Sequence, residues 1–244
     1  MVDLHTHILP GIDDGARDLQ EALSMLAMEQ ATGVSRIFLT PHFNPEKTST
    51  EAFLSAREDA WLRLTAALDP GTAPQLRLGA EVRFCPQLLD MDLKPLTLGS
   101  SDYLLLEPAG QTCPPNLLQI TDRFLRRGIV PVFAHVERYA FFRQNPSLLK
   151  RLTDLGALAQ VTAGALFDRQ DQRFSQACLQ HNLAQLVASD AHRTVGRKPC
   201  MDLVNNLPEP VRQLHRAFSE AVWDNEVAPY VSASVTKKTF FGYR

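Results

Sequence analysis

The chain opens at residues 1–15 with the sequence M-V-D-L-H-T-H-I-L-P-G-I-D-D-G. Apolar and polar residues alternate from residue 2 onward, which predicts a short β-strand over residues 2–7. Side chains two residues apart in a strand share one face, so His5 and His7 point the same way, roughly 7 Å apart along the strand. Two imidazoles at this spacing can bind one metal ion.

A loop follows this strand, because Pro10, Gly11 and Gly15 interrupt regular structure. The loop carries Asp13 and Asp14, whose ionised carboxylates only accept hydrogen bonds. The H-x-H pattern alone leaves two interpretations open, a metal site and a histidine pair packed in the core. The rest of the chain decides between them.

Length and composition limit the classes of protein that are possible. The 244 residues suffice for one large α/β barrel or two small domains, and 45% hydrophobic with 21% charged residues is ordinary for a globular protein. A formal net charge of -2 excludes an electrostatic footprint for nucleic acid or an anionic membrane. No apolar run is long enough to span a membrane, and no signal peptide is evident, so we expect a cytoplasmic protein.

Apolar segments rich in β-branched residues alternate with amphipathic segments along the chain. Strands are predicted over residues 2–7, 35–40, 76–84, 102–107, 129–134, 157–162 and 185–188, and helices over 18–32, 50–68, 116–127, 147–155, 170–181 and 210–223. This alternation predicts a parallel sheet buried on both faces. About seven such units favour a barrel over an open sheet, and the absence of a linker predicts one domain over residues 1–244.

Most of the predicted strands end at a side chain of a type that binds metals. Strand ends meet at one mouth of a parallel barrel, so these residues should converge. Imidazole and carboxylate without thiolate favour Mn²⁺, Fe²⁺ or Zn²⁺ over Mg²⁺ or Ca²⁺, and nine candidates are enough for two or three ions. The candidate ligands are His5, His7, Asp14, His42, Glu81, Glu107, His135, Asp190 and His192. The other two histidines, His181 and His215, are expected in surface or core positions.

Several short motifs in this order resemble the PHP (polymerase and histidinol phosphatase) superfamily: H-T-H at residues 5–7, T-P-H at 40–42, G-A-E at 79–81, A-H-V-E-R at 134–138 and S-D-A-H at 189–192. The opening D-L-H-T-H-I-L-P-G-I-D-D-G-A is more specific. It resembles the capsule and exopolysaccharide tyrosine-phosphatase branch, the CpsB/YwqE type. This resemblance implies a distorted (β/α)7 barrel of the PHP type, with a metal cluster at the carboxyl mouth of the strands.

The resemblance also implies a role for each candidate residue. One ion would be held by His5, His7, Glu81 and Asp190, a second by Glu81, Glu107 and His135, and a third by Asp14, His42 and His192. Asp13 would then face elsewhere. Arg138 and Arg197 would bind the phosphate, a role that suits the planar fork of arginine. The metals would be manganese, as is usual in this superfamily.

The activity implied by the resemblance is metal-dependent hydrolysis of phosphotyrosine, on the tail of a bacterial tyrosine kinase that controls polysaccharide export. The residues exclude a cysteine phosphatase independently, since none of Cys85, Cys113, Cys178 and Cys200 begins a C-x5-R motif. Two alternatives remain open. One is a PHP phosphoesterase for a small molecule such as histidinol phosphate, and the other is a metal-bound scaffold without catalysis.

Overall fold

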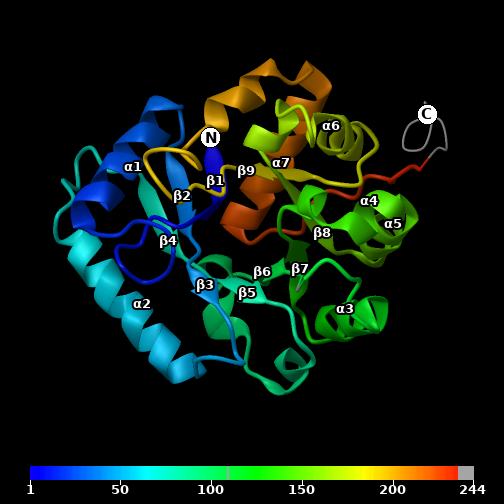
Figure 1. Ribbon diagram of the computed structural model, residues 1–244, viewed down its shortest axis with the longest axis horizontal. Helices are drawn as coiled ribbons and strands as arrows, with labels where there is room; N and C mark the ends of the chain where they lie inside the picture. The colour runs from blue at the N-terminus through cyan, green and yellow to red at the C-terminus, as the bar shows by residue number, and fades with distance from the viewer. Residues whose placement is uncertain (109, 236–244) are drawn as a thin grey trace.

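A computed structural model describes residues 1–108 and 110–235 (Figure 1). The strands are β1 (Val2–Thr6), β2 (Arg36–Leu39), β3 (His42–Phe43), β4 (Gln75–Leu78), β5 (Glu81–Arg83), β6 (Tyr103–Glu107), β7 (Val130–Phe133), β8 (Leu158–Thr162) and β9 (Leu186–Ala188). The α-helices are α1 (Leu19–Ala31), α2 (Thr50–Thr65), α3 (Leu117–Arg126), α4 (Ala140–Gln144), α5 (Pro146–Leu155), α6 (Gln172–Gln180) and α7 (Glu209–Asp224). The 3₁₀ helices are η1 (Pro86–Asp90), η2 (Lys94–Leu96), η3 (Leu98–Ser100), η4 (Val136–Arg138), η5 (Gly164–Leu166) and η6 (Met201–Asn206).

The strands form a curled, parallel sheet with most of the helices around its outside (Figure 1). One part has the order β1-β2-β4 and the other the order β3-β5-β6-β7-β8-β9, and every pairing is parallel. A parallel bridge between Thr6 and Ala191 brings the end of β9 to the end of β1. The prediction of a parallel α/β sheet is therefore confirmed.

The single strand predicted over residues 76–84 is wrong, because the chain forms two strands there. β4 pairs with β2, whereas β5 pairs with β3 and β6. Gly79 lies between the two strands, and its backbone packs closely against Leu98. A Cβ atom at Gly79 would be only 2.9 Å from the Leu98 side chain. This turn places Glu81 at the carboxyl end of the sheet, whereas the sequence pattern placed Glu81 in the middle of one strand.

Two apolar clusters stabilise the fold on the two sides of the sheet. The outer cluster joins strand residues such as Ile37 and Phe133 to the surrounding helices. The inner cluster joins alternate residues of the strands, such as Leu105, to Phe218 and Trp223 of α7. Helix α7 therefore packs on the inner side of the sheet and leaves the carboxyl ends of the strands free for a site. No helix in the described part is long and apolar enough to cross a membrane.

Candidate metal centre

The nine predicted ligands lie together at the carboxyl ends of the strands. The strand geometry explains this, since parallel strands end at a common edge. They are carried by β1 and the loop after it (His5, His7, Asp14), by β3, β5 and β6 (His42, Glu81, Glu107), and by the segments after β7 and β9 (His135, Asp190, His192). All nine lie within a few ångströms of at least one partner that is distant in sequence.

The first group contains His5, His7 and Glu81, which are fully or almost fully buried. The two histidine Nε2 atoms lie 3.1 Å apart, and Glu81 Oε2 is 3.2 Å from His5 Nε2 and 3.3 Å from His7 Nε2. Asp190 joins this group, with Oδ1 3.4 Å and 3.5 Å from the same two nitrogens. The ladder between β1 and β2 shifts register between Asp3 and Thr6, an irregularity of the kind that re-aims side chains near sites.

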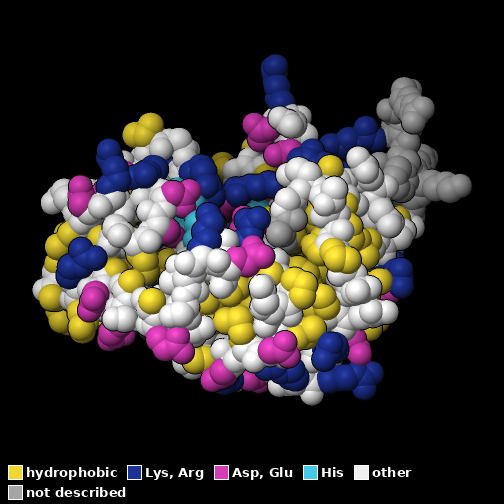
Figure 2. Space-filling view, turned by 60° about the horizontal axis from the view of Figure 1, so that its bottom comes forward, with side chains coloured by type: hydrophobic (Ala, Val, Ile, Leu, Met, Phe, Trp, Pro, Cys, Tyr) yellow, Lys and Arg dark blue, Asp and Glu magenta, His cyan; other side chains and the backbone are white. Residues whose placement is uncertain are grey.

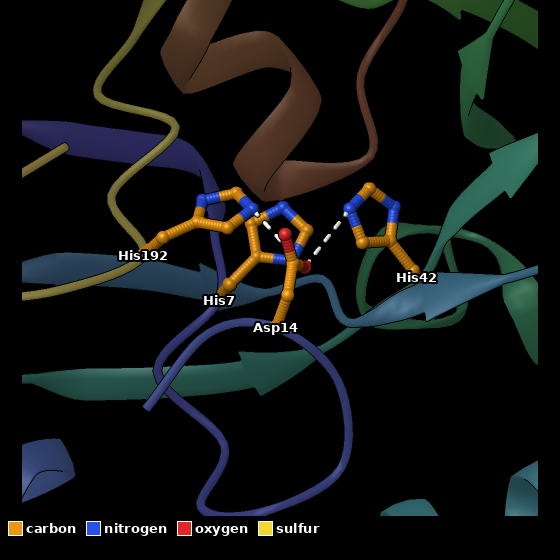
Figure 3. A group of neighbouring side chains, drawn as sticks. All are labelled: His7, Asp14, His42 and His192. Atoms are coloured by element: carbon orange, nitrogen blue, oxygen red, sulfur yellow. Dashed lines mark ion pairs between the residues drawn. The ribbon is translucent and has the colours of Figure 1, made fainter. Parts of the chain in front are cut away.

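The second group contains His7, Asp14, His42 and His192, and one ligand atom from each lies within 4.8 Å of the others (Figure 3). Asp14 Oδ1 is 3.3 Å from His42 Nε2 and 3.5 Å from His192 Nε2. The loop after β1 brings Asp14 here by folding tightly over His7. Gly15 permits that approach, because a Cβ atom at this position would be 2.0 Å from the His7 carbonyl oxygen.

The third group contains His42, Glu81 and Glu107. His135 contacts this group through Glu81, since its Nε2 lies 2.7 Å from Glu81 Oε1. Glu81 therefore stands between the groups, with one oxygen toward His135 and the other 2.9 Å from His42 Nδ1. A carboxylate in this position is suited to bridge two ions.

The buried polar atoms of these groups fit divalent cations. Within the described residues, Glu81 Oε2, Asp190 Oδ1 and His192 Nε2 are buried without a hydrogen-bond partner. A buried polar group without a partner is costly, and such atoms require an explanation. Glu81 Oε2 and Asp190 Oδ1 both face the Nε2 atoms of His5 and His7, whereas His192 Nε2 faces Asp14 Oδ1. Bound metal ions would satisfy this arrangement.

The electrostatics of the groups favour ionised carboxylates. Burial opposes the charge of Glu81, but His5 and the contacts with His135 and His42 hold its pKa well below the ordinary value. Burial also opposes the charge of Asp190, and interactions with His5, His7 and Arg138 hold its pKa well below normal. The pKa of His7 is raised against burial by hydrogen bonds to Asp13, Asp190 and Glu81. The ionised carboxylates of Glu81 and Asp190 are stabilised by nearby positive charge, and bound cations would supply such charge.

Asp13 contacts the site directly, whereas the resemblance implied that it would face elsewhere. Its Oδ2 lies 2.7 Å from His7 Nδ1 and accepts a hydrogen bond from the His42 backbone N–H at 3.0 Å. Its Oδ1 accepts a hydrogen bond from Gly15 N–H at 2.9 Å. A carboxylate on Nδ1 fixes the imidazole so that Nε2 faces the cluster. The adjacent Asp-Asp pair was the sequence signal for this role.

Gln160 and Tyr139 support two other histidines and were not predicted from the sequence. Gln160 lies on β8, and its Oε1 is 3.2 Å from His5 Nδ1. The same oxygen accepts a hydrogen bond from the backbone N–H of His135 at 3.0 Å. The Tyr139 hydroxyl is 3.2 Å from His135 Nδ1. A glutamine within an apolar strand carries no motif, so only the folded structure identifies it.

Two of the predicted ligands have left-handed backbone conformations, with φ of 33° at His135 and 53° at Asp190. Residues other than glycine rarely adopt this region, and such strain gathers at functional sites. Each residue comes two positions after the last residue of a strand, β7 or β9, where the change of direction aims its side chain into the mouth.

Arg138 and Arg197 lie at the edge of the cluster and contact the same atom. Arg197 is 2.5 Å from Asp190 Oδ2, and Arg138 forms an ion pair with that oxygen. The opposite oxygen, Oδ1, faces His5 and His7. Both arginine side chains are about two-fifths exposed, and Figure 2 shows dark-blue side chains around a hollow in which histidine and carboxylate side chains are visible.

The remaining histidines and the cysteines lie outside these groups, as expected. His215 is buried and accepts a hydrogen bond from Val187 N–H at 3.2 Å, and His181 Nδ1 lies 3.0 Å from Ser234 Oγ. All four cysteines are free, and burial raises the pKa of Cys200 to about 12. A thiol with a raised pKa is a poor nucleophile, which agrees with the absence of a cysteine-phosphatase motif.

Comparisons with known proteins bear on the fold and on the family. A family model described as capsular polysaccharide synthesis, CpsB/CapC, matches residues 1–220. The tyrosine-protein phosphatase YwqE of Bacillus subtilis (strain 168) is 35% identical over 204 residues, covering 81% of this chain and 79% of the relative. The putative tyrosine-protein phosphatase CapC of Staphylococcus aureus is 32% identical over 206 residues, with 81% and 79% covered.

A solved structure shares the fold. It comes from crystal structures of YwqE from Bacillus subtilis and CpsB from Streptococcus pneumoniae, described as unique metal-dependent tyrosine phosphatases. The TM-score is 0.85 at 28% sequence identity, and the match covers 97% of this chain and 100% of the solved chain. The resemblance drawn from the sequence is confirmed, and this chain belongs to the CpsB/CapC family of capsular polysaccharide synthesis.

Proposed function

We propose that this chain is a metal-dependent protein-tyrosine phosphatase, a phosphoric monoester hydrolase. The observation that carries the proposal is the placement of Arg138 and Arg197 on one oxygen of Asp190, whose other oxygen faces the histidine cluster. A phosphoryl group held there would contact both the guanidinium groups and the metal cluster. The relatives named tyrosine-protein phosphatases support the choice of phosphotyrosine as the substrate group.

The proposed ligand sets follow the three groups of side chains. His5, His7, Glu81 and Asp190 would hold one ion, Glu81, Glu107 and His135 a second, and Asp14, His42 and His192 a third. Mn²⁺ is the proposed metal, and Fe²⁺ or Zn²⁺ also suits imidazole and carboxylate ligands. When bound, the ions would supply Lewis acidity toward the phosphoryl oxygens and a nucleophile derived from water.

The protein's own groups would bind and orient the substrate. Arg138 and Arg197 would form charge-assisted hydrogen bonds with the phosphoryl oxygens and neutralise the charge that develops on them. Asp13 would hold the His7 ring, and Gln160 the His5 ring, so that both Nε2 atoms stay directed at the site. Burial of Glu81 and Asp190 keeps bulk water away from the ligand side of the cluster.

We also propose that the curled sheet is a distorted (β/α)7 barrel in one domain over residues 1–244, of which residues 109 and 236–244 lie outside the described part. Only two residues separate β2 from β3 and β4 from β5, so each pair would count as one bent strand. The order of pairings then passes through seven strands and returns from β9 to β1 at the bridge between Thr6 and Ala191.

The proposed natural substrate is a phosphotyrosine tail of a bacterial tyrosine kinase that controls capsule or exopolysaccharide synthesis. The family description supports a role in capsular polysaccharide synthesis. The phosphoryl group on such a kinase comes from ATP, which is present in the cytoplasm. The phosphatase would therefore act in the cytoplasm.

The direct test measures phosphate release from a phosphotyrosine peptide by protein that has been stripped with a chelator and then given Mn²⁺. Activity should vanish on stripping and return with Mn²⁺. Histidinol phosphate serves as the parallel substrate. Hydrolysis of histidinol phosphate without hydrolysis of the peptide would replace the proposal with a small-molecule phosphoesterase, and binding of the peptide without any phosphate release would replace it with a scaffold.

The role of Arg138 is tested by Arg138→Ala. Removing one preorganised donor to a charged transition state lowers kcat by about 100- to 1,000-fold in other enzymes, and we expect a loss of this order with unchanged metal content. Arg126→Ala is the matched control, because Arg126 is exposed on α3 and forms an ion pair with Asp122 in the described part of the chain, away from the metal centre. Full activity of Arg138→Ala would refute its role.

A further inference from the structure

A cavity of about 370 Å³ adjoins the candidate metal centre on the side of the two arginines. Its lining includes Asp190, Arg138 and Arg197, together with Glu137, Gly164 and Ala165. The loops after β7, β8 and β9 therefore form its walls. The volume lies within the range of small-molecule sites, about 300–1,000 Å³.

The structure points to this cavity as the subsite for the aromatic ring of the phosphotyrosine substrate. We propose that the ring lies between the loop of Gly164 and Ala165 and the loop of Arg197. This inference rests on the proposed phosphatase function and adds the direction from which the substrate enters.

The position of the arginines gives the first argument. Asp190 Oδ1 faces the histidines, and Asp190 Oδ2 faces Arg138 and Arg197. A phosphoryl group that contacts both the cluster and the guanidinium groups must therefore lie beside Asp190. These same three residues line the cavity, so the ester oxygen and the ring attached to it have space there. Guanidinium groups also pack favourably on aromatic faces.

The wall after β8 gives the second argument. Gly164 is exposed, and a Cβ atom at this position would meet no atom within 4 Å. With Ala165 beside it, this wall leaves open space next to the arginines. A flat ring needs such space, whereas a bulky side chain at this position would occupy it.

The walls are fixed to one another, which makes the cavity preformed. Glu137 Oε1 accepts the backbone N–H of Thr162 at 3.2 Å and also its hydroxyl, so the loops after β7 and β8 are joined. The Arg143 guanidinium donates to the Glu137 carbonyl oxygen at 2.5 Å and pairs with Asp171 at the start of α6. On the opposite side, His192 N–H donates to the Arg197 carbonyl oxygen at 2.8 Å and closes the loop that carries Arg197.

Glu137 gives a third, independent argument for a ligand. It is fully buried and lines the cavity, and its Oε2 has no hydrogen-bond partner within the described part of the chain. An unsatisfied buried carboxylate oxygen beside a cavity is suited to accept a hydrogen bond from a bound molecule. A peptide that carries phosphotyrosine offers backbone N–H donors next to the ring.

The test fills the cavity with Gly164→Phe and, as a second variant, Gly164→Leu. The affinity for a peptide with the non-hydrolysable phosphonomethyl-phenylalanine should fall by about tenfold or more, the scale of a steric mismatch in a pocket. The kcat/KM for the phosphotyrosine peptide should fall equally. Inhibition by inorganic phosphate, which has no ring, should be unchanged, and so should the Mn²⁺ content.

The matched control is Gly71→Phe, because Gly71 is an exposed turn residue away from the cavity, and full activity is expected of it. Unchanged peptide affinity in both Gly164 variants with normal Mn²⁺ content would overturn the inference and leave the phosphatase function standing. Equal weakening of inorganic phosphate and the peptide would also overturn it, since the effect would then lie at the phosphate. Failure of the unaltered protein to hydrolyse the peptide would overturn the proposed function, and the inference with it.

Discussion

Asp13→Asn is the most informative single change, because it alters no proposed metal ligand. Asp13 receives three hydrogen bonds, from His7 Nδ1 and His42 N–H on Oδ2 and from Gly15 N–H on Oδ1. Asparagine keeps only one oxygen. With that oxygen toward His7, its NH₂ group faces the Gly15 donor and leaves it unsatisfied, which costs about 1–3 kcal/mol of folding free energy. The His7 ring also loses its charged partner, which typically weakens metal binding by about 10- to 100-fold.

The assay is a competition between the protein and a chelator for Mn²⁺, combined with urea denaturation of the metal-free protein. Asp18→Asn is the matched control, because Asp18 caps α1 by accepting the Glu21 N–H, and asparagine caps a helix as well as aspartate does. We expect weaker Mn²⁺ binding only in Asp13→Asn. Mn²⁺ affinity within about twofold of the unaltered protein would refute the argument that Asp13 orients His7.

Three further predictions follow from the same structure. Arg197→Lys should fall well short of full activity, because lysine cannot reproduce the planar fork that contacts Asp190 and would bind phosphate; activity equal to arginine would contradict this. Metal removal should lower the Tm by about 5–10 °C for each site that was saturated at 100 times its Kd, as measured by thermal denaturation with and without chelator. Burial lowers the pKa of His215 in the folded protein to about 4. As the pH falls from 6.5 to 4, the unfolded chain therefore binds a proton at this histidine before the folded chain does. Over this range the free energy of unfolding should fall by up to about 3 kcal/mol because of this site. His215→Gln should flatten that part of the pH profile in urea denaturation, and an identical profile would refute the assignment.

The parts of the fold that were predicted from sequence are those with strong local signals. The expected helix over residues 18–32 forms as α1, since Asp18 caps it and an apolar face packs on the outer cluster. The short β3 and the division of residues 76–84 were missed. Their boundaries depend on which neighbouring strand supplies hydrogen bonds, and a single segment of sequence does not contain that information.

Most of the candidate ligands could be found from the sequence because they come near the ends of apolar strands, and parallel strands carry their ends to one edge. Only the tertiary structure decided which of them meet. It placed Glu81 between His42 and His135, brought Asp13 onto His7, and set Gln160 against His5. It also placed an open cavity beside Arg138 and Arg197. Local periodicity determines strands and their faces, whereas contacts between residues far apart depend on the curvature and register of the whole sheet, which exist only after folding.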